Sequence, residues 1–505
     1  MKNIKYIIIL AVMIGCSNDL EEQVYSNVSP SNFYKNAADG DAAVSAIYNA
    51  LNRAVSLWDF GLTSTVATMH PYFIGRVGWR NHWADYTVSS GDGLGLPRSW
   101  NPLYQAIFRA NVAISELSTR TFEGSEEVTR GYLIAEAQWL RAWSYFHLTQ
   151  LFGNVPMPLV PAQSIETANL PATPREAIYA QIISDLQDAE ANLPTIRTIP
   201  AELGRPNVGT AKFLLAKVYL TMAGAQVNDA SKMALAHSKI KEVIDNASAY
   251  GYELLPSYAD AIYIDNNSER VWAIQQTQAV EGQGTAGTFV WAGIGSTNGG
   301  VPRGQAHGGW TQEFYDLYES GDTRRDVTMQ YSYIHSDTGE ETFFSGQPVA
   351  DYDGDPYKQT WGIPNNKYKD SDQGCCDGDP DIIYYRYSDA LLMYAEAENS
   401  LNGPTATAYE YLNMVRERGG ASALTPGSHT KEEFAELMFT ERLLEFTFEC
   451  QELYDIRRLG KVQEIIESAP LPVKEGTVYK AAFEVWPIPN TEVNANAELE
   501  QNPGW

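Results

Sequence analysis

The feature that most constrains the fold of this chain is a helical spacing of apolar residues that recurs along most of its length. Apolar side chains follow one another at three- and four-residue intervals, the period of one helix face, in nine stretches joined mostly by short connections. The nine stretches are residues 42–51, 103–117, 132–151, 175–193, 210–222, 234–244, 383–401, 405–418 and 431–448. The pattern predicts an all-α protein whose helices stack in pairs, like a solenoid, although no clean 34-residue repeat is present.

Local signals refine these helices. Thr173 is predicted to cap the helix over residues 175–193, with Pro174 opening it and Pro194 closing it. Arg141, beside an apolar seam, is expected to pair with a carboxylate such as Glu136.

The four cysteines cannot supply a disulfide framework for 505 residues, so a large hydrophobic core must stabilise the fold. Cys450 lies on a predicted helix and is interpreted as a buried, small apolar residue. The adjacent Cys375 and Cys376, on a glycine-flanked acidic loop, suggest a vicinal disulfide that would stiffen the tip of that loop.

The N-terminus has the pattern of a secretory signal. After a basic start, residues 6–15 form an apolar run of about ten residues, whereas a membrane span needs about 20. The ending Ile14-Gly15-Cys16 resembles a bacterial lipobox, in which the cysteine is acylated; the alternative is an ordinary signal peptide with a bystander cysteine. We expect a signal peptide over residues 1–15 and a lipidated flexible tether over 16–30.

The net charge of the chain limits the kinds of partner that it can bind. Acidic residues outnumber basic ones by 63 to 36, and the formal net charge is −27. Such a surface repels nucleic acid and other polyanions at long range, so no nucleic-acid partner is expected and neutral or cationic ligands are favoured. The acidic run after Cys16 resembles the Bacteroidetes signal that sends lipoproteins to the outer face of the outer membrane.

Two long stretches interrupt the helical pattern. Residues 69–99 and 279–381 are rich in Gly, Asp, Asn and aromatic residues and have little periodicity. Loops of this length are functional or disordered, and their Trp and Tyr content argues against disorder. We therefore predict one helical domain over residues 31–505, in which the loops at about 69–99 and 279–381 form a ligand face.

Several sequence blocks, in order, resemble the SusD/RagB family of nutrient-binding lipoproteins. The blocks are Trp100-x3-Tyr104 with Ala110-Asn111, Ala135-Glu136-Ala137-Gln138-Trp139-Leu140-Arg141-Ala142 with Phe152-Gly153-Asn154-Val155-Pro156, Pro174-Arg175 with Ile183-x-Asp185-Leu186, Gly204-Arg205, Arg386-Tyr387-Ser388-Asp389, Val415-Arg416-x-Arg418, Glu441-Arg442-x2-Glu445-Phe446, Tyr454-Asp455-Ile456-Arg457-Arg458, Trp486-Pro487-Ile488-Pro489 and Gln501-Asn502-Pro503-Gly504-Trp505. Most of these residues are expected to pack and to maintain the fold.

The resemblance implies four tetratricopeptide-like helix pairs and a role in nutrient capture. It implies a SusC-like TonB-dependent transporter as partner, with this protein acting as its lid. It also implies that the protein is not an enzyme and needs no cofactor. The ligand would be a poly- or oligosaccharide; binding of peptides, as by RagB-like relatives, and glycoside hydrolysis are the alternatives.

Aromatic rings that stack on sugars, flanked by amide and guanidinium groups, are the side chains such a ligand face requires. The expected ligand-binding residues are Trp79, Trp83 and Trp291, supported by Tyr72, Arg76, Asn81 and Tyr86. For any one of these tryptophans, anchoring its loop to the helical body is the competing role. Trp310, which leads into a predicted helix over residues 312–318, is expected to pack in the core.

Other chemistry has weak support. The acidic loops 351–355 and 377–381 contain oxygen ligands of the kind calcium uses, but the twelfth position of an EF-hand counted from Asp351 is Gly362. Solvated turns are therefore favoured over a structural calcium site. No zinc-protease, nucleophile-elbow or phosphate-loop motif is present, whereas the two carboxylates of a glycosidase cannot be recognised by pattern.

Overall fold

The computed structural model describes most of the chain. The described residues are 33–55, 71–73, 82–83, 86–199, 202–277, 279, 308–334, 340–343, 363–368, 378–468 and 477–505. Within them the protein is mainly helical, which confirms the predicted fold class. None of the helices in these segments is long and apolar enough to cross a bilayer.

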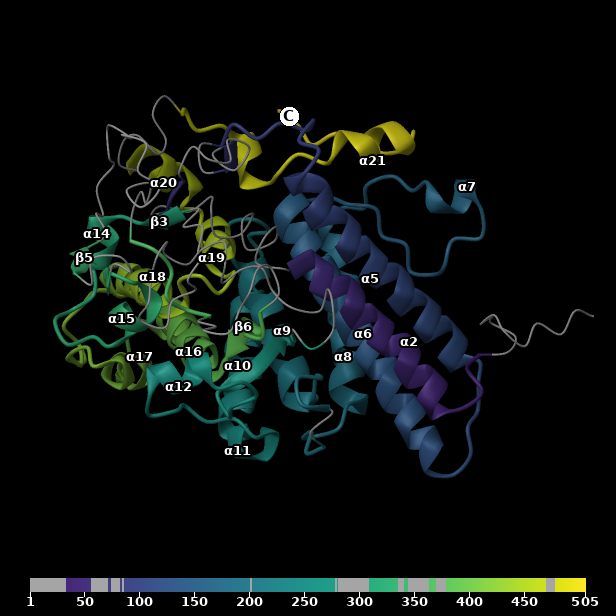
Figure 1. The fold of residues 1–505 in the computed structure, drawn as a ribbon, viewed down its shortest axis with the longest axis horizontal. Coiled ribbons are helices and arrows are strands. Elements are labelled where there is room, and N and C mark those ends of the chain that lie inside the picture. Colours follow the sequence, from purple (N-terminus) through teal and green to yellow (C-terminus); the bar gives the residue numbers. More distant parts are fainter. Residues whose placement is uncertain are drawn as a thin grey trace, which may run out of the picture.

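Nine helices build the body, and each packs against the next along the chain except the last, α18, which packs against α16 (Figure 1). They are α2 (Ala37–Val55), α5 (Gly95–Ser118), α6 (Ser125–Phe152), α8 (Arg175–Asn192), α9 (Val208–Ala223), α10 (Lys232–Asp245), α16 (Tyr387–Asn402), α17 (Ala406–Gly419) and α18 (Lys431–Phe446). α16 contacts α10 directly, so the long segment between these two helices leaves and rejoins the same stack.

Short elements complete the described structure. The short helices are α7 (Ile165–Ala168), α11 (Ala247–Tyr250), α12 (Tyr258–Tyr263), α14 (Gln312–Tyr315), α15 (Arg324–Thr328), α19 (Glu452–Arg458), α20 (Val462–Ser468), the 3-10 helix η3 (Ala481–Glu484) and α21 (Asn490–Ala495). Three antiparallel two-stranded sheets pair β1 (Pro71–Phe73) with β3 (Gly308–Trp310), β2 (Arg270–Ile274) with β6 (Ile382–Arg386), and β4 (Ser332–Ile334) with β5 (Glu341–Phe343).

Capping residues fix several helix ends. Asn207 and Thr210 form a capping box at the start of α9, and Thr430 and Glu433 form another at the start of α18. α17 ends at Gly420, whose φ of 90° is a left-handed conformation that glycine adopts without strain. The predicted helix bounds therefore agree with the observed ones to within a few residues wherever such local signals exist.

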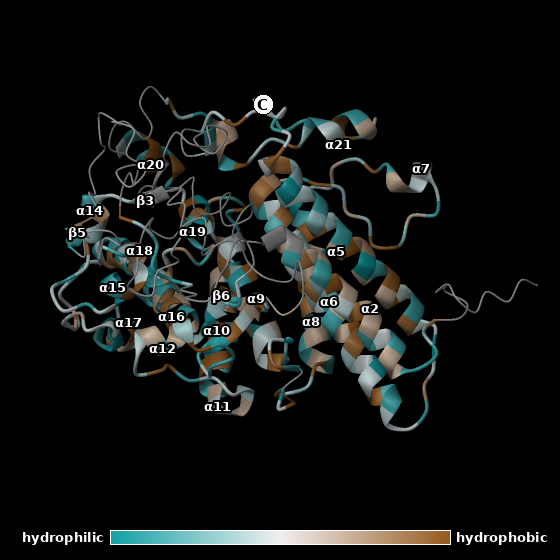
Figure 2. Cartoon of the chain, in the orientation of Figure 1, coloured by the Kyte–Doolittle hydropathy of each residue, from teal (hydrophilic) through white to brown (hydrophobic). Residues whose placement is uncertain are grey.

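The core lies where α6 meets the β2–β6 sheet. The second half of α6 is buried on all sides, and its Trp139 and Trp143 pack against Trp272 of β2 with ring centroids 4.8 and 5.0 Å apart. Figure 2 shows hydrophobic and hydrophilic residues alternating along α2 and α5, as expected for helices that bury one face.

Two local predictions were wrong, and a third was right only in part, because Arg141 pairs with a carboxylate as expected but not with Glu136. Residues 383–386, predicted as helix, belong to strand β6, because this short buried run of Ile, Tyr and Arg pairs with β2. The N-cap of α8 is Pro174, not Thr173, whose backbone instead bridges to Val155. Arg141 forms a bidentate pair with Asp185 of α8, at 2.7 and 2.8 Å.

Two further sequence interpretations can be compared with the structure. Glu136, the carboxylate expected to pair with Arg141, instead accepts hydrogen bonds from Tyr48 and Arg197, at 2.6 and 2.9 Å. Cys450 is buried as predicted, but it follows the end of α18 and has a φ of 57°, so it is not helical.

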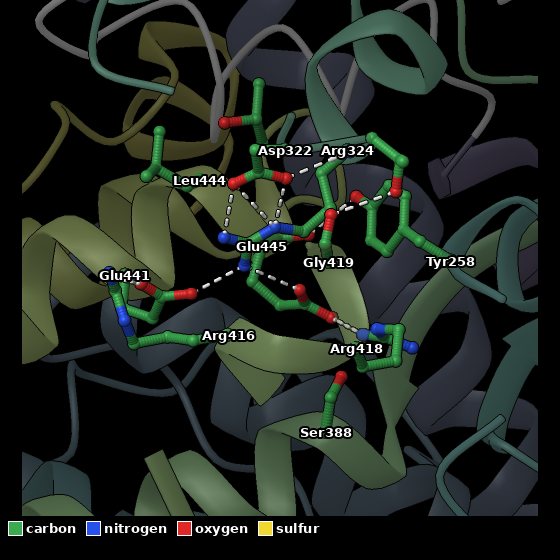
Figure 3. Close-up of polar contacts among 12 residues, drawn as sticks. Tyr258, Asp322, Arg324, Ser388, Arg416, Arg418, Gly419, Glu441, Leu444 and Glu445 are labelled. Atoms are coloured by element: carbon green, nitrogen blue, oxygen red, sulfur yellow. Dashed lines mark hydrogen bonds and ion pairs between the residues drawn. The ribbon is translucent and has the colours of Figure 1, made fainter. Parts of the chain in front are cut away.

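A buried ionic network joins the segment between α10 and α16 to the helical body. Arg386, at the end of β6, bonds to Glu269, Glu445 and Glu449 at 2.6, 2.8 and 2.8 Å. Arg324 of α15 bonds to Asp322, Glu441 and Glu445 at 2.7, 2.5 and 3.1 Å (Figure 3). The carboxylate of Glu445 on α18 therefore connects two segments that are distant in sequence.

Arg418 and Lys367 complete this network. Arg418 pairs with Glu269 at 2.7 Å and also with Glu445, while Lys367 pairs with Glu449 at 2.7 Å. Burial alone would raise the pKa of Glu445, but Arg418, Arg386 and Arg324 hold that pKa well below its usual range. The network thus keeps the carboxylate of Glu445 ionised in the interior.

The substitution Glu445→Gln should destabilise the protein strongly. Removing this charge leaves three buried arginines with too few counter-ions, and breaking a buried pair costs about 3–5 kcal/mol. Urea denaturation of the native and variant proteins measures the free energy of unfolding. Asp245→Asn, which removes an exposed partner of Lys241, is the control and should change little. Equal effects of the two substitutions would contradict a structural role for the network.

Candidate functional site

The two predicted loop regions meet in space. Strand β1 lies in the first region and β3 in the second, and they pair antiparallel with Tyr72 opposite Gly309 and Pro71 opposite Trp310. The paired backbones bring residues 71–73 of the first region beside residues 308–310 of the second. This pairing defines the loop face, meaning the surface built on β1 and β3.

Trp310 anchors the second region to the body. Its N–H donates to the carbonyl of Ile363 and its carbonyl accepts from the N–H of Ile363, at 2.9 and 2.8 Å. The indole is buried and packs edge-on against Phe448, with ring centroids 5.6 Å apart. The predicted packing role of Trp310 is confirmed, although α14 after it ends at Tyr315.

Trp83 and Tyr86 anchor the middle of the first region. Trp83 is 0% exposed and meets Trp486 at 4.9 Å between ring centroids. Tyr86 is 2% exposed and lies 5.4 Å from Trp486 and 5.2 Å from Phe483. Neither ring presents a face to a ligand, so we replace the predicted ligand contact of both residues by a packing role.

The other predicted site residues can be placed only in part. Tyr72 lies on β1. Arg76, Trp79, Asn81 and Trp291 lie outside the described residues, as do Cys16, Cys375, Cys376 and the acidic loop 351–355. The ligand-binding roles of these side chains therefore stay predictions.

A polar cavity lies at the root of the loops and was not anticipated from the sequence. It has a volume of about 290 Å³ and is lined by α2, by the end of β2 and by the Gly204-Arg205 turn. Its lining residues are Ser45, Tyr48, Asn49, Asn52, Leu203, Gly204, Arg205, Ala273, Ile274 and Gln275. Amide and guanidinium groups are suited to binding hydroxyl-rich ligands.

Internal hydrogen bonds hold the walls of this root cavity. Arg205 donates to Asp41 at 2.6 Å and to Ser45 at 3.2 Å, and Asn52 accepts from Gln276 at 3.1 Å. In the sequence, Gly204-Arg205 was identified only as one of the blocks that resemble the family. Its neighbours on α2 and β2 are far away in sequence, so only the folded chain brings these side chains together.

Asp381, at the end of the second loop region, bonds to the residues that precede the start of that region. It accepts from the backbone N–H of Gln276 at 3.0 Å and from the side-chain amide of Gln275 at 3.3 Å. Burial, together with the nearby carboxylate of Asp265, raises the pKa of Asp381 to about 7. The residues just before and just after this region are therefore fastened to one another.

No group of three or more His, Cys, Asp and Glu side chains is arranged to hold a metal ion among the described residues. In the acidic stretch 377–381, the carboxylate of Asp381 accepts hydrogen bonds from Gln275 and Gln276. The buried His147 contacts Tyr454 at 3.0 Å, and burial lowers its pKa well below the usual value. These features have structural roles, so the candidate site rests on the β1–β3 pairing and on the cavity at the root of the loops.

Comparison with known proteins gives consistent matches along the chain. A family model described as the SusD family matches residues 237–505, and one described as starch-binding associating with the outer membrane matches residues 21–220. The SusD-like protein P2 of Formosa agariphila is 26% identical over 99% of both chains.

Solved structures show the same fold. A SusD homologue from Bacteroides thetaiotaomicron has a TM-score of 0.80 at 23% identity and covers 94% of this chain and 98% of its own. A structure described as a laminarin-binding SusD-like protein has a TM-score of 0.76 at 26% identity and covers 94% of this chain and 100% of its own.

The substitution Asp381→Asn should flatten the pH dependence of stability between about pH 4 and pH 7. The folded-state pKa of about 7 lies above the ordinary value of 3.8, so the folded protein keeps a proton that the unfolded chain releases. This carboxyl therefore lowers the free energy of unfolding as the pH rises through that window. Asparagine keeps an oxygen for the N–H of Gln276 but does not titrate.

The measurement is Tm against pH for the native and variant proteins. The Tm of the native protein should rise relative to that of the variant as the pH falls from 7 to 5. Curves that run parallel over this range would show that Asp381 titrates normally.

Proposed function

This chain belongs to the SusD family, and we propose that it is a lipid-anchored protein of the outer membrane that captures a glycan and delivers it to a SusC-like TonB-dependent transporter. The pairing of β1 with β3 carries the proposal, because it joins one strand from each of the two aromatic-rich regions. The lipobox-like Cys16 would hold this face at the cell surface.

Three observations favour a glycan as the ligand. The predicted loop residues include Trp79 and Trp291, whose rings suit stacking on sugar faces. The cavity at the root of the loop face offers Asn49, Asn52 and Gln275 to hydroxyl groups. The relative that is described as binding laminarin shares the fold over nearly the whole chain.

The proposed mechanism is capture followed by release, without bond cleavage. The ligand would lie on the loop face while the helical body stays rigid, because the buried network around Arg386 and Glu445 fixes the segments that support the loops. Binding would exclude water from the sugar faces that stack on aromatic rings. Peptide binding is the second candidate, since aromatic pockets also receive peptide side chains.

Affinity gel electrophoresis of the protein lacking residues 1–16 tests the glycan proposal. The panel contains laminarin, soluble starch, xylan and mannan, and one of these should retard the protein without release of reducing sugar. Release of product would establish an enzyme instead. Retardation by none of them, with binding of peptides by calorimetry, would replace the glycan by a peptide ligand.

Substitutions then separate ligand contacts from anchors. Trp79→Ala and Trp291→Ala should each weaken glycan affinity by about tenfold or more, as for a buried aromatic contact, and leave Tm nearly unchanged. Trp83→Ala should instead lower Tm, because its ring is buried against Trp486. Unchanged glycan affinity in both loop variants would remove these two residues from the site.

Copurification tests the transporter partner. The lipidated protein, extracted from outer membranes in mild detergent, should carry a TonB-dependent transporter with it in a fixed ratio. A protein that elutes alone under conditions that preserve other outer-membrane complexes would contradict this part of the proposal.

A further inference from the structure

A second groove lies outside the loop face, between α5, α7 and α21. It has a volume of about 470 Å³. Its lining residues are Trp100, Asn101, Tyr104, Pro156, Pro158, Ala168, Asn169, Glu492, Ala495, Asn496 and Leu499. Figure 1 shows α21 and α7 beside the end of α5 from which this groove opens.

An aromatic stripe runs along α5 from this groove onto the open surface. Trp100, Tyr104 and Phe108 recur every four residues, which places successive rings about 6 Å apart along one side of the helix. Trp100 is 3% exposed, Tyr104 is half-buried, and Phe108 is 53% exposed. The rings of Trp100 and Tyr104 lie 4.8 Å apart at an interplanar angle of 37°.

Hydrogen bonds fix the floor of the groove, while other polar groups stay available. The hydroxyl of Tyr104 donates to the carbonyl of Pro156 at 2.6 Å, and Asn496 donates to the carbonyl of Leu170 at 2.8 Å. Asn101 is exposed and Asn169 is half-buried, and neither amide bonds to another of the described residues. Two free amides therefore stand beside a row of aromatic rings.

The chemistry of the groove selects a neutral, hydroxyl-rich ligand. Glu492 is the only ionisable carboxylate in its lining, and no Lys, Arg or His lines it. A polyanion would find no cation there, whereas a sugar ring finds apolar faces for its C–H groups and amides for its hydroxyls. Phe108 is a large apolar side chain that remains more than half exposed, which is the position a stacking contact requires.

The groove lies beside the C-terminal part of the first loop region. α5 begins at Gly95, within the last residues of that region, and the N–H of Asn490 at the start of α21 donates to the carbonyl of Ser90 at 2.9 Å. A polysaccharide that extends beyond the first loop region can therefore continue along α5.

We propose that the groove and the α5 stripe form a second glycan contact, which binds the outer part of a long polysaccharide held on the loop face. This inference rests on the proposed glycan-binding function and adds a length requirement to it. A short oligosaccharide fills the loop face alone, and a longer chain also reaches Tyr104 and Phe108. Affinity should accordingly increase with chain length.

Two surface substitutions test the second contact without touching the core. Phe108→Ala removes the exposed ring, and Ala168→Trp fills the groove from an exposed position. The matched controls are Met414→Ala on α17 and Ala435→Trp on α18, both exposed and away from α5. Calorimetry measures binding of the panel polysaccharide that retards the native protein and of a trisaccharide with the same linkage.

Both test variants should weaken binding of the polysaccharide by about threefold to tenfold, the effect of one aromatic contact, and leave trisaccharide binding unchanged. The controls should match the native protein. Native affinity in both test variants, or an equal loss for short and long ligands, would overturn the second contact and leave the proposed function intact. A native protein that binds no glycan at all would remove the proposed function and this inference together.

Discussion

Burying a charge is costly unless every ion finds a partner, and this requirement organises the centre of the molecule. Glu445 and Glu449 on or just after α18 are neutralised by Arg386 at the end of β6, while Arg324 and Lys367 reach them from the segment between α10 and α16. The paired state has one geometry, because each guanidinium bonds in a fixed plane. A segment whose described helices are all short is thereby held against the helical stack at several points, which makes a defined loop face possible.

The pairing of buried polar groups also distinguishes the residues that support the fold from those that can bind a ligand. The helices and the ionic network use residues that are buried and mutually satisfied, so their chemistry is not available to a ligand. The loop regions are attached by a few apolar anchors, Trp83 and Tyr86 on one side and Trp310 on the other. Side chains between these anchors can change without disturbing the core, which is how one fold supports many ligands.

The sequence predicted what depends on local periodicity and missed what depends on distant partners. Helical spacing located all nine major helices, but the apolar run 382–386 suits a buried strand as well as a helix, and only its partner β2 decides. Glu136 and Arg141 are five residues apart and do not share a helix face, so Arg141 pairs with Asp185 on another helix instead. The cavity beside Gly204 needs α2 and β2 together, and no spacing within one segment reveals it.

Aromatic residues illustrate the remaining limit, because composition does not separate an anchor from a binding surface. Trp83, inside the first loop region, and Phe108, outside both regions, are both large apolar rings. Trp83 is 0% exposed, so the free energy of its burial is already used in the folded protein, whereas the ring of Phe108 is 53% exposed and keeps that free energy for a ligand. A binding surface built from aromatic side chains must leave part of their area in water until the ligand arrives. By this criterion Phe108, in the middle of α5, is a stronger candidate for ligand contact than the buried Trp83 that the loop composition favoured.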